Sequence, residues 1–277
     1  MRKIRLISAM YSEANFLINR FLSAMGAPLV DFISEAGAML LLFFSALRHI
    51  FNRRMLSRTC RQVYVIGAKS LFLIALIGIF TGMVLGLQGY YALSKFGSEG
   101  LLGALVALSL IRELGPVLAA IMIAGRAGSS MAAEIGVMRI TDQIDALDVM
   151  DINSVSYLIS PRLLASIIVF PLLTAVFDVI GIIGGYLTGV VMLGINSGVF
   201  FYRMELNVDM VDVSGGFIKS LVFAALVAII CCHMGYYAHL RRDGVGPEAV
   251  SNAITSAVVM SCVLILCSDY IMTSLLM

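Results

Sequence analysis

Long apolar stretches alternate with short polar segments from about residue 63 to the end of the chain. Each uncharged run is long enough to cross roughly 30 Å of hydrocarbon as a helix of about 20 residues. The runs are 70–94, 179–202, 220–240 and 249–268. Together with a fifth apolar stretch, 100–125, which two charges interrupt, this pattern predicts an all-α membrane protein with about five transmembrane helices. We place these helices at about 63–94, 100–125, 156–194, 214–239 and 249–275.

The composition agrees with this prediction and excludes a soluble domain. Of the 277 residues, 60% are hydrophobic and 13% are charged, whereas soluble proteins carry about 25% charged residues. The net charge of +2 does not indicate nucleic-acid binding. The five cysteines have neither the spacing of metal ligands nor that of a disulfide framework.

The N-terminal region is basic. Residues 1–61 hold nine of the nineteen Lys and Arg residues, so the positive-inside rule predicts that this region is cytoplasmic. Two interpretations of its apolar segment, 30–50, are open: a short span, or a helix that lies in the membrane interface. We favour the interfacial helix, because Asp31, Glu35 and Gly37 interrupt the apolar run.

The topology follows from the charge pattern and the number of spans. With a cytoplasmic N-terminus, the segments 126–155 and 239–248 fall in the cytoplasm, and the C-terminus falls outside. The loops at 95–99 and about 196–213 also fall outside, and they carry few cations. We divide the chain into two parts: a basic cytoplasmic or interfacial region, 1–61, and a transmembrane domain, 62–277.

Glycines repeat every four residues in the first and third predicted spans. The first ladder is Gly78, Gly82 and Gly86, and the second is Gly181, Gly185 and Gly189. Small residues at this spacing let helix backbones approach closely in lipid. We expect close packing within one chain, and a subunit interface is the alternative.

Two adjacent charges, Arg112 and Glu113, interrupt the second predicted span, and Pro116 follows them. Adjacent helical residues do not face each other, and no ionic residue lies four positions away from either. Pro116 also leaves the carbonyl of Arg112 without its helical hydrogen bond. A buried ion pair that braces the bundle is one interpretation. We favour a polar spot in a substrate cavity, because a broken helix is tolerated where it borders protein or water.

The predicted cytoplasmic segment after the second span looks helical from about Gly136. Two stripes follow it: an apolar stripe of Ile140, Ile144 and Leu147, and an acidic stripe of Asp142, Asp145 and Asp148. Such a helix either lies passively at the membrane surface or acts as a lever that a cytoplasmic partner moves.

Motifs for catalysis are missing. The segment 67–70, "GAKS", lacks the glycines of a phosphate-binding loop. Ser129 and Ser130 have no evident histidine base, and no cluster has metal-ligand spacing. We therefore expect a non-catalytic protein with no bound cofactor or metal.

Three motifs resemble the MlaE (YrbE) family of permeases. They are "GMVLGLQGYYAL" (82–93), "ALSLIRELGPVLAAIMIAGRAGSSMAAEIGVMRITDQIDAL" (107–147) and "ISPRLLASIIVFPLLT" (159–174). The resemblance implies a homodimeric permease of a phospholipid ABC transporter in the bacterial inner membrane. It also implies a separate cytoplasmic ATPase that holds ATP and Mg²⁺, a periplasmic MCE-domain protein and, in some systems, a STAS-domain protein. Phospholipid would move between the inner and outer membranes.

The resemblance also assigns residues to two sites. The lipid cavity would use Leu85, Leu93, Phe96, Arg112, Glu113 and Lys219. Coupling to the ATPase would use Glu134, Gly136, Arg139, Asp142, Asp145 and Asp148. No role follows for Asp178 or for Asp269.

A secondary transporter or channel is the main alternative. In it, Arg112, Glu113 and Asp178 would relay ions through the membrane. Inverted repeats would favour this reading, and none is apparent in the sequence.

Overall fold

The computed structural model describes residues 33–48, 55–240 and 246–276. Over these residues the chain is helical and has no strand. Five helical segments are long and apolar enough to cross a membrane, which confirms the predicted all-α fold. They are Leu56–Ser94, Glu99–Ile140, Val155–Met192, Met210–Tyr236 and Pro247–Leu276.

The chain separates into two compact units, Met1–Phe44 and Ser45–Met277. A helix covers residues 33–48, within the segment predicted to lie in the membrane interface, and that placement stays a prediction. Most of the basic residues of region 1–61, together with Arg241 and Arg242, lie outside the described residues.

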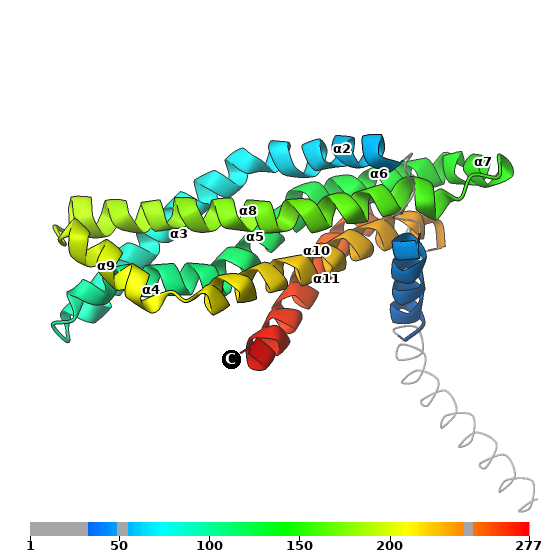
Figure 1. Ribbon diagram of the computed structural model, residues 1–277. Helices are drawn as coiled ribbons and strands as arrows, with labels where there is room; N and C mark the ends of the chain where they lie inside the picture. The colour runs from blue at the N-terminus through cyan, green and yellow to red at the C-terminus, as the bar shows by residue number, and fades with distance from the viewer. Residues whose placement is uncertain (1–32, 49–54, 241–245, 277) are drawn as a thin grey trace, which may run out of the picture. The chain divides into compact units, whose positions relative to one another are not determined.

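The second unit holds the five long segments (Figure 1). Its α-helices are α2 (Leu56–Val63), α3 (Lys69–Ser94), α4 (Leu102–Ser109), α5 (Gly115–Ile123), α6 (Ser129–Ile140), α7 (Gln143–Val149), α8 (Ser160–Tyr186), α9 (Ser197–Asn207), α10 (Met210–Tyr236) and α11 (Pro247–Leu276). Short π-helical turns join several of them into continuous spans. These turns are Tyr64–Ala68, Leu110–Leu114, Ala124–Gly128, Val155–Ile159 and Leu187–Met192. The predicted boundary at 61/62 therefore falls inside one continuous helix, which runs from α2 into α3.

The two glycine ladders meet within the chain, between α3 and α8. A Cβ added to Gly82 would collide with the carbonyl oxygen of Gly181, and one on Gly86 would lie 3.1 Å from that of Gly185. Residue numbers increase in the same direction along both helices from one contacting pair to the next, so α3 and α8 run parallel. This direction is required, because one other span separates them in the chain. We call this contact the glycine seam. It brings the two backbones close enough for van der Waals contact between main-chain atoms.

The ladder in the third span has a second neighbour. Cβ atoms on Gly181, Gly185 and Gly189 would lie 2.6–2.9 Å from side-chain carbons of Leu110, Val106 and Leu102, which belong to the second span. The third span is therefore held between the first and the second spans.

A similar close contact joins the second and fourth spans. A Cβ on Gly216 would lie 2.5 Å from the carbonyl oxygen of Ile111, and one on Gly235 would lie 2.6 Å from that of Ala132. The fourth span thus runs parallel to the second, and this contact fixes the height at which residues of α10 face the π-helical turn Leu110–Leu114.

The second span is longer than predicted. It was placed at 100–125, but α6 continues the helix to Ile140. The helix then breaks at Thr141 and Asp142, where Asp142 has a φ of 56°. Because the break falls between Ile140 and Ile144, the apolar stripe is divided between α6 and the short α7. The acidic stripe begins at the break with Asp142 and continues on α7.

The predicted outer loop, 196–213, contains a helix that the sequence did not reveal. The side-chain oxygen of Asn196 caps α9 and accepts hydrogen bonds from the N–H groups of Gly198 and Val199, at 2.8 and 3.3 Å. Phe200 is fully buried, and its carbonyl packs against Gly103 of α4. The loop is therefore a packed part of the bundle.

Candidate functional site

The site begins at the π-helical turn Leu110–Leu114. Pro116 has no N–H to offer the carbonyl of Arg112, as the sequence indicated. The ammonium group of Lys219, on α10, instead donates a hydrogen bond to that carbonyl oxygen at 2.9 Å. A side chain from the fourth span therefore satisfies the backbone irregularity of the second.

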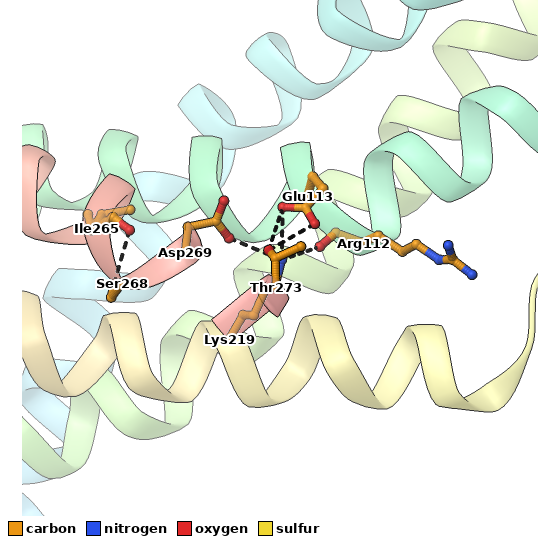
Figure 2. Close-up of polar contacts among 7 residues, drawn as sticks. All are labelled: Arg112, Glu113, Lys219, Ile265, Ser268, Asp269 and Thr273. Atoms are coloured by element: carbon orange, nitrogen blue, oxygen red, sulfur yellow. Dashed lines mark hydrogen bonds and ion pairs between the residues drawn. The ribbon is translucent and has the colours of Figure 1, made fainter. Parts of the chain in front are cut away.

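Lys219 is 3% exposed and is the centre of a polar cluster (Figure 2). Its Nζ lies 2.8 Å from Oε2 of Glu113 and donates to the hydroxyl of Thr273 at 2.7 Å. Oδ1 of Asp269 lies 3.1 Å from Nζ, at an ion-pair distance but without the geometry of a hydrogen bond. Thr273 also donates to Glu113 at 3.1 Å. We call Glu113, Lys219, Asp269 and Thr273 the lysine cluster.

The lysine cluster joins three spans and holds two carboxylates around one ammonium. A charge removed from water needs a partner and further hydrogen bonds, and Lys219 has both. Asp269 and Thr273 are four residues apart on α11, so both face the same side of that helix. The cluster therefore fixes the end of α11 against the second and fourth spans.

Arg112 has a separate partner. Figure 2 shows its side chain extending away from the lysine cluster. Its Nε donates to Oδ1 of Asp212 at 2.7 Å, and the Arg112 side chain is 40% exposed. Asp212 also accepts from the N–H of Asp209, as part of the capping box that begins α10. The two adjacent charges thus pair with different residues of one helix, α10.

A cavity of about 450 Å³ opens beside these charges. Its lining combines the polar groups with a few apolar ones: Arg112, Glu113, Asp209, Val211, Asp212, Gly215, Gly216, Lys219, Thr273 and Leu276. The charged pair therefore both braces the helices and borders a cavity, although the sequence presented these as alternatives.

Three of the six residues predicted for lipid binding share this cavity: Arg112, Glu113 and Lys219. The other three do not. Leu85 lines a separate pocket of about 320 Å³ on α3, beside Leu114. Leu93 lies near the end of α3, and Phe96 is 82% exposed just beyond it. A single copy of the chain does not bring the two groups together.

Asp212 and Thr273 belong to the site but were not singled out from the sequence. The pair of aspartates before an apolar run, Asp209 and Asp212, was a usable signal, because it is typical of a helix start. Thr273 gave no such signal. Asp269, to which no role was assigned, lies in the lysine cluster.

Asp178 lies apart from this site. It packs against Gly115 and lines a pocket of about 170 Å³ with mostly apolar residues. Its Oδ1 is buried and has no hydrogen-bond partner among the described residues. Arg112 and Glu113 do not line that pocket, so the three charges of an ion relay do not share one cavity.

The residues predicted for coupling divide into two groups. Arg139 pairs with Asp145 of α7 at 2.6 Å, and its Nε donates to Nδ1 of His239 at 2.9 Å. Partial burial, together with the positive charge of Arg139, lowers the pKa of His239 below its usual value. Asp142 and Asp148 are exposed.

The remaining two coupling residues lie against neighbouring spans. Glu134 pairs with Arg162 of α8 at 2.8 Å. A Cβ on Gly136 would lie 3.2 Å from Val250 of α11.

No group of three or more His, Cys, Asp or Glu side chains in the described part of the chain is placed to hold a metal ion.

Comparison with known proteins agrees with the resemblance that the sequence motifs indicate. Residues 59–275 match the family described as Permease MlaE. The chain is 40% identical over 262 residues to the intermembrane phospholipid transport system permease protein MlaE of Haemophilus influenzae, which covers 94% of this chain and 98% of that protein.

Two further relatives show how widely the similarity extends. A probable ABC transporter permease protein of Rickettsia conorii is 42% identical over 254 residues, covering 91% of this chain and 96% of that protein. The chloroplastic protein TRIGALACTOSYLDIACYLGLYCEROL 1 of Arabidopsis thaliana is 34% identical over 216 residues, covering 78% and 60%. The family match includes every residue that lines the 450 Å³ cavity except Leu276.

Proposed function

The chain belongs to the MlaE permease family, and we propose that it moves phospholipids between the inner and outer membranes as the membrane subunit of an ABC transporter. Its family and its five apolar helices indicate a multi-pass protein of the inner membrane. The names of the Haemophilus and Rickettsia relatives support the substrate and the transporter class, respectively.

One observation carries the proposal: the 450 Å³ cavity places a half-exposed guanidinium beside apolar residues. Arg112 lines the cavity and is bonded to Asp212 through its Nε, so its terminal N–H groups have no hydrogen-bond partner among the described residues. A guanidinium matches the geometry of a phosphate. The cavity therefore suits the headgroup of a phospholipid.

Other subunits complete the proposed transporter. Leu85, Leu93 and Phe96 lie outside the cavity of one copy. In the proposed dimer, the second copy brings these residues toward the acyl chains of the bound lipid. A separate ATPase binds ATP and Mg²⁺, which fits the missing phosphate-binding loop. An MCE-domain protein receives or delivers lipid on the periplasmic side, and a STAS-domain protein accompanies the ATPase.

The ATPase docks at the cytoplasmic end, where α7 lies. In this orientation the N-terminus is cytoplasmic and the C-terminus is periplasmic. Asp142, Asp145 and Asp148 offer negative charge to a basic surface of the ATPase. Replacing all three with Lys should release the ATPase while the permease still folds. Unchanged copurification would refute this role.

The proposal is tested with the purified complex in liposomes. ATP-dependent transfer of labelled phospholipid is measured for the wild type, Arg112→Gln and Arg203→Gln. Arg203 is an exposed arginine of α9 outside the cavity, so it serves as the matched control. We expect Arg112→Gln to reduce transfer about tenfold or more, because it loses charge-assisted bonds to the headgroup.

Two results would refute the proposal. One is lipid transfer by Arg112→Gln at the wild-type rate. The other is ion-driven transport by the chain alone, without ATP or an ATPase, which is the result that a secondary transporter predicts.

A further inference from the structure

A second charged pocket lies where α2 and α8 begin, and it shares no residue with the lysine cluster. Its volume is about 330 Å³, and its lining includes three arginines: Arg58, Arg61 and Arg162. Glu134 is the one carboxylate in the lining. The pocket therefore carries an excess of two positive charges. We call it the arginine pocket.

The Arg162 side chain, which lines the pocket, is 6% exposed, which is unusual for an arginine. Two of its nitrogens are bonded: Nη2 to Glu134 at 2.8 Å and Nη1 to the carbonyl of Leu158 at 2.7 Å. Its Nε is buried and has no hydrogen-bond partner among the described residues. A buried N–H donor without a partner is costly, so an acceptor bound beside Arg162 would stabilise this side chain.

The other two arginines lie at the mouth of the pocket, on exposed positions of α2. The guanidinium of Arg58 stacks over the ring of Tyr157, at 3.7 Å from the ring centroid. This contact holds the planar group in place at low entropic cost. The N–H groups at its edges stay available for a planar or tetrahedral anion.

Gln62 and several apolar residues complete the lining, among them Val65, Leu158 and Pro161. Leu56 of α2 and Tyr64 of the π-helical turn that follows it are 69% and 61% exposed, as expected for residues that face lipid. A group of arginines beside apolar residues suits an amphipathic anion better than a free inorganic anion.

We propose that the arginine pocket binds the phosphate of an anionic phospholipid from the leaflet at this end of the bundle. The positive-inside rule places this end in the cytoplasm, where the leaflet carries anionic lipid. The bound lipid belongs to the surrounding membrane and is separate from any lipid in the 450 Å³ cavity. It would hold α2 and α8 together at the point where both spans begin.

The test compares lipid binding to purified variants by native mass spectrometry. The probes are phosphatidylglycerol and phosphatidylcholine with the same acyl chains, and inorganic phosphate alone. All variants carry Arg112→Gln, so that a lipid in the other cavity does not contribute. The substitutions are Arg58→Gln and Arg61→Gln, and Lys69→Gln is the control, since Lys69 is an exposed cation outside the pocket. Arg162 is left unchanged, because it also bonds Glu134 and Leu158 inside the bundle.

We expect phosphatidylglycerol to bind more tightly than phosphatidylcholine. Arg58→Gln and Arg61→Gln should each weaken that binding roughly fivefold, and Lys69→Gln should not. Equal binding of the two lipids would overturn the proposal, and so would an equal loss in Lys69→Gln. Binding of inorganic phosphate as tight as that of the lipid would overturn the lipid assignment and leave a site for free phosphate.

Discussion

The glycine seam and the lysine cluster hold helices together in opposite ways. In the seam, Gly82 and Gly181 bring two backbones into contact with no polar side chain between them. In the cluster, the long side chain of Lys219 reaches carboxylates on two other spans, and a cavity lies beside it. Close contact needs small residues and leaves no space, whereas charged side chains can bridge a space that a ligand also uses. The difference separates the part of the bundle that packs from the part that binds.

The seam should be the harder of the two to alter. Gly82→Leu would place a side chain where the Gly181 carbonyl lies, and neither backbone can yield without moving a whole span. We expect a destabilisation of about 3 kcal/mol or more, and loss of folded protein in size-exclusion chromatography. Gly125→Ala is the control, because a Cβ there meets nothing within 4 Å. Normal yield of Gly82→Leu would show that α3 and α8 are not in contact.

The lysine cluster should be sensitive mainly to the loss of its one cation. Lys219→Met leaves Glu113 and Asp269 facing each other without a counter-charge, which should destabilise the protein by about 2–3 kcal/mol, less than the loss of a partner in a fully buried pair because both carboxylates are partly exposed. The measurement is the apparent Tm of the purified chain. Adding Glu113→Gln and Asp269→Asn to Lys219→Met should recover part of the loss. If the triple variant is less stable than Lys219→Met, charge imbalance is not the cause.

Removing one carboxylate should cost less than removing the lysine. Glu113→Gln leaves Lys219 paired with Asp269, and the Glu113 side chain is already 34% exposed. We therefore expect a loss of about 1 kcal/mol, seen as a small drop in apparent Tm with normal assembly. A loss as large as that of Lys219→Met would mean that Asp269 does not compensate for Glu113.

The smallest effect is expected at Asp178, which belongs to neither region. No described residue forms a hydrogen bond with its buried Oδ1, so no pairing is lost when the carboxyl becomes an amide. Asp178→Asn should change stability by less than about 1 kcal/mol. Lipid transfer and apparent Tm, measured together, check this. A marked loss of transfer at unchanged Tm would instead assign Asp178 to the transport cycle.

The spans could be predicted from the sequence because hydrophobicity and length determine them locally. The glycine spacing likewise pointed to close contact, since both ladders repeat every four residues. The partners of Arg112 and Glu113 could not be predicted in this way. Asp212 lies 100 positions from Arg112, and Lys219 lies 106 from Glu113. Hydrophobicity identifies helices but does not say which helices lie together.

Two local features were also missed, for physical reasons. The helix end at Asp142 uses a left-handed backbone at an aspartate, where a glycine would have been the usual signal. The helix α9 is short, and its stability comes from burial of Phe200 against α4 rather than from a strong pattern of its own. At α9, therefore, tertiary packing decides the local conformation.

The glycine seam has a mechanical consequence. Two helices whose main chains are in contact cannot slide or rotate past each other without a collision. We therefore expect α3 and α8 to move as one rigid unit. The ion pairs around Lys219 can break and re-form with other partners at much lower cost. Because Gly216 and Gly235 hold α10 to the second span by the same kind of backbone contact, movement during a transport cycle should be concentrated in α11.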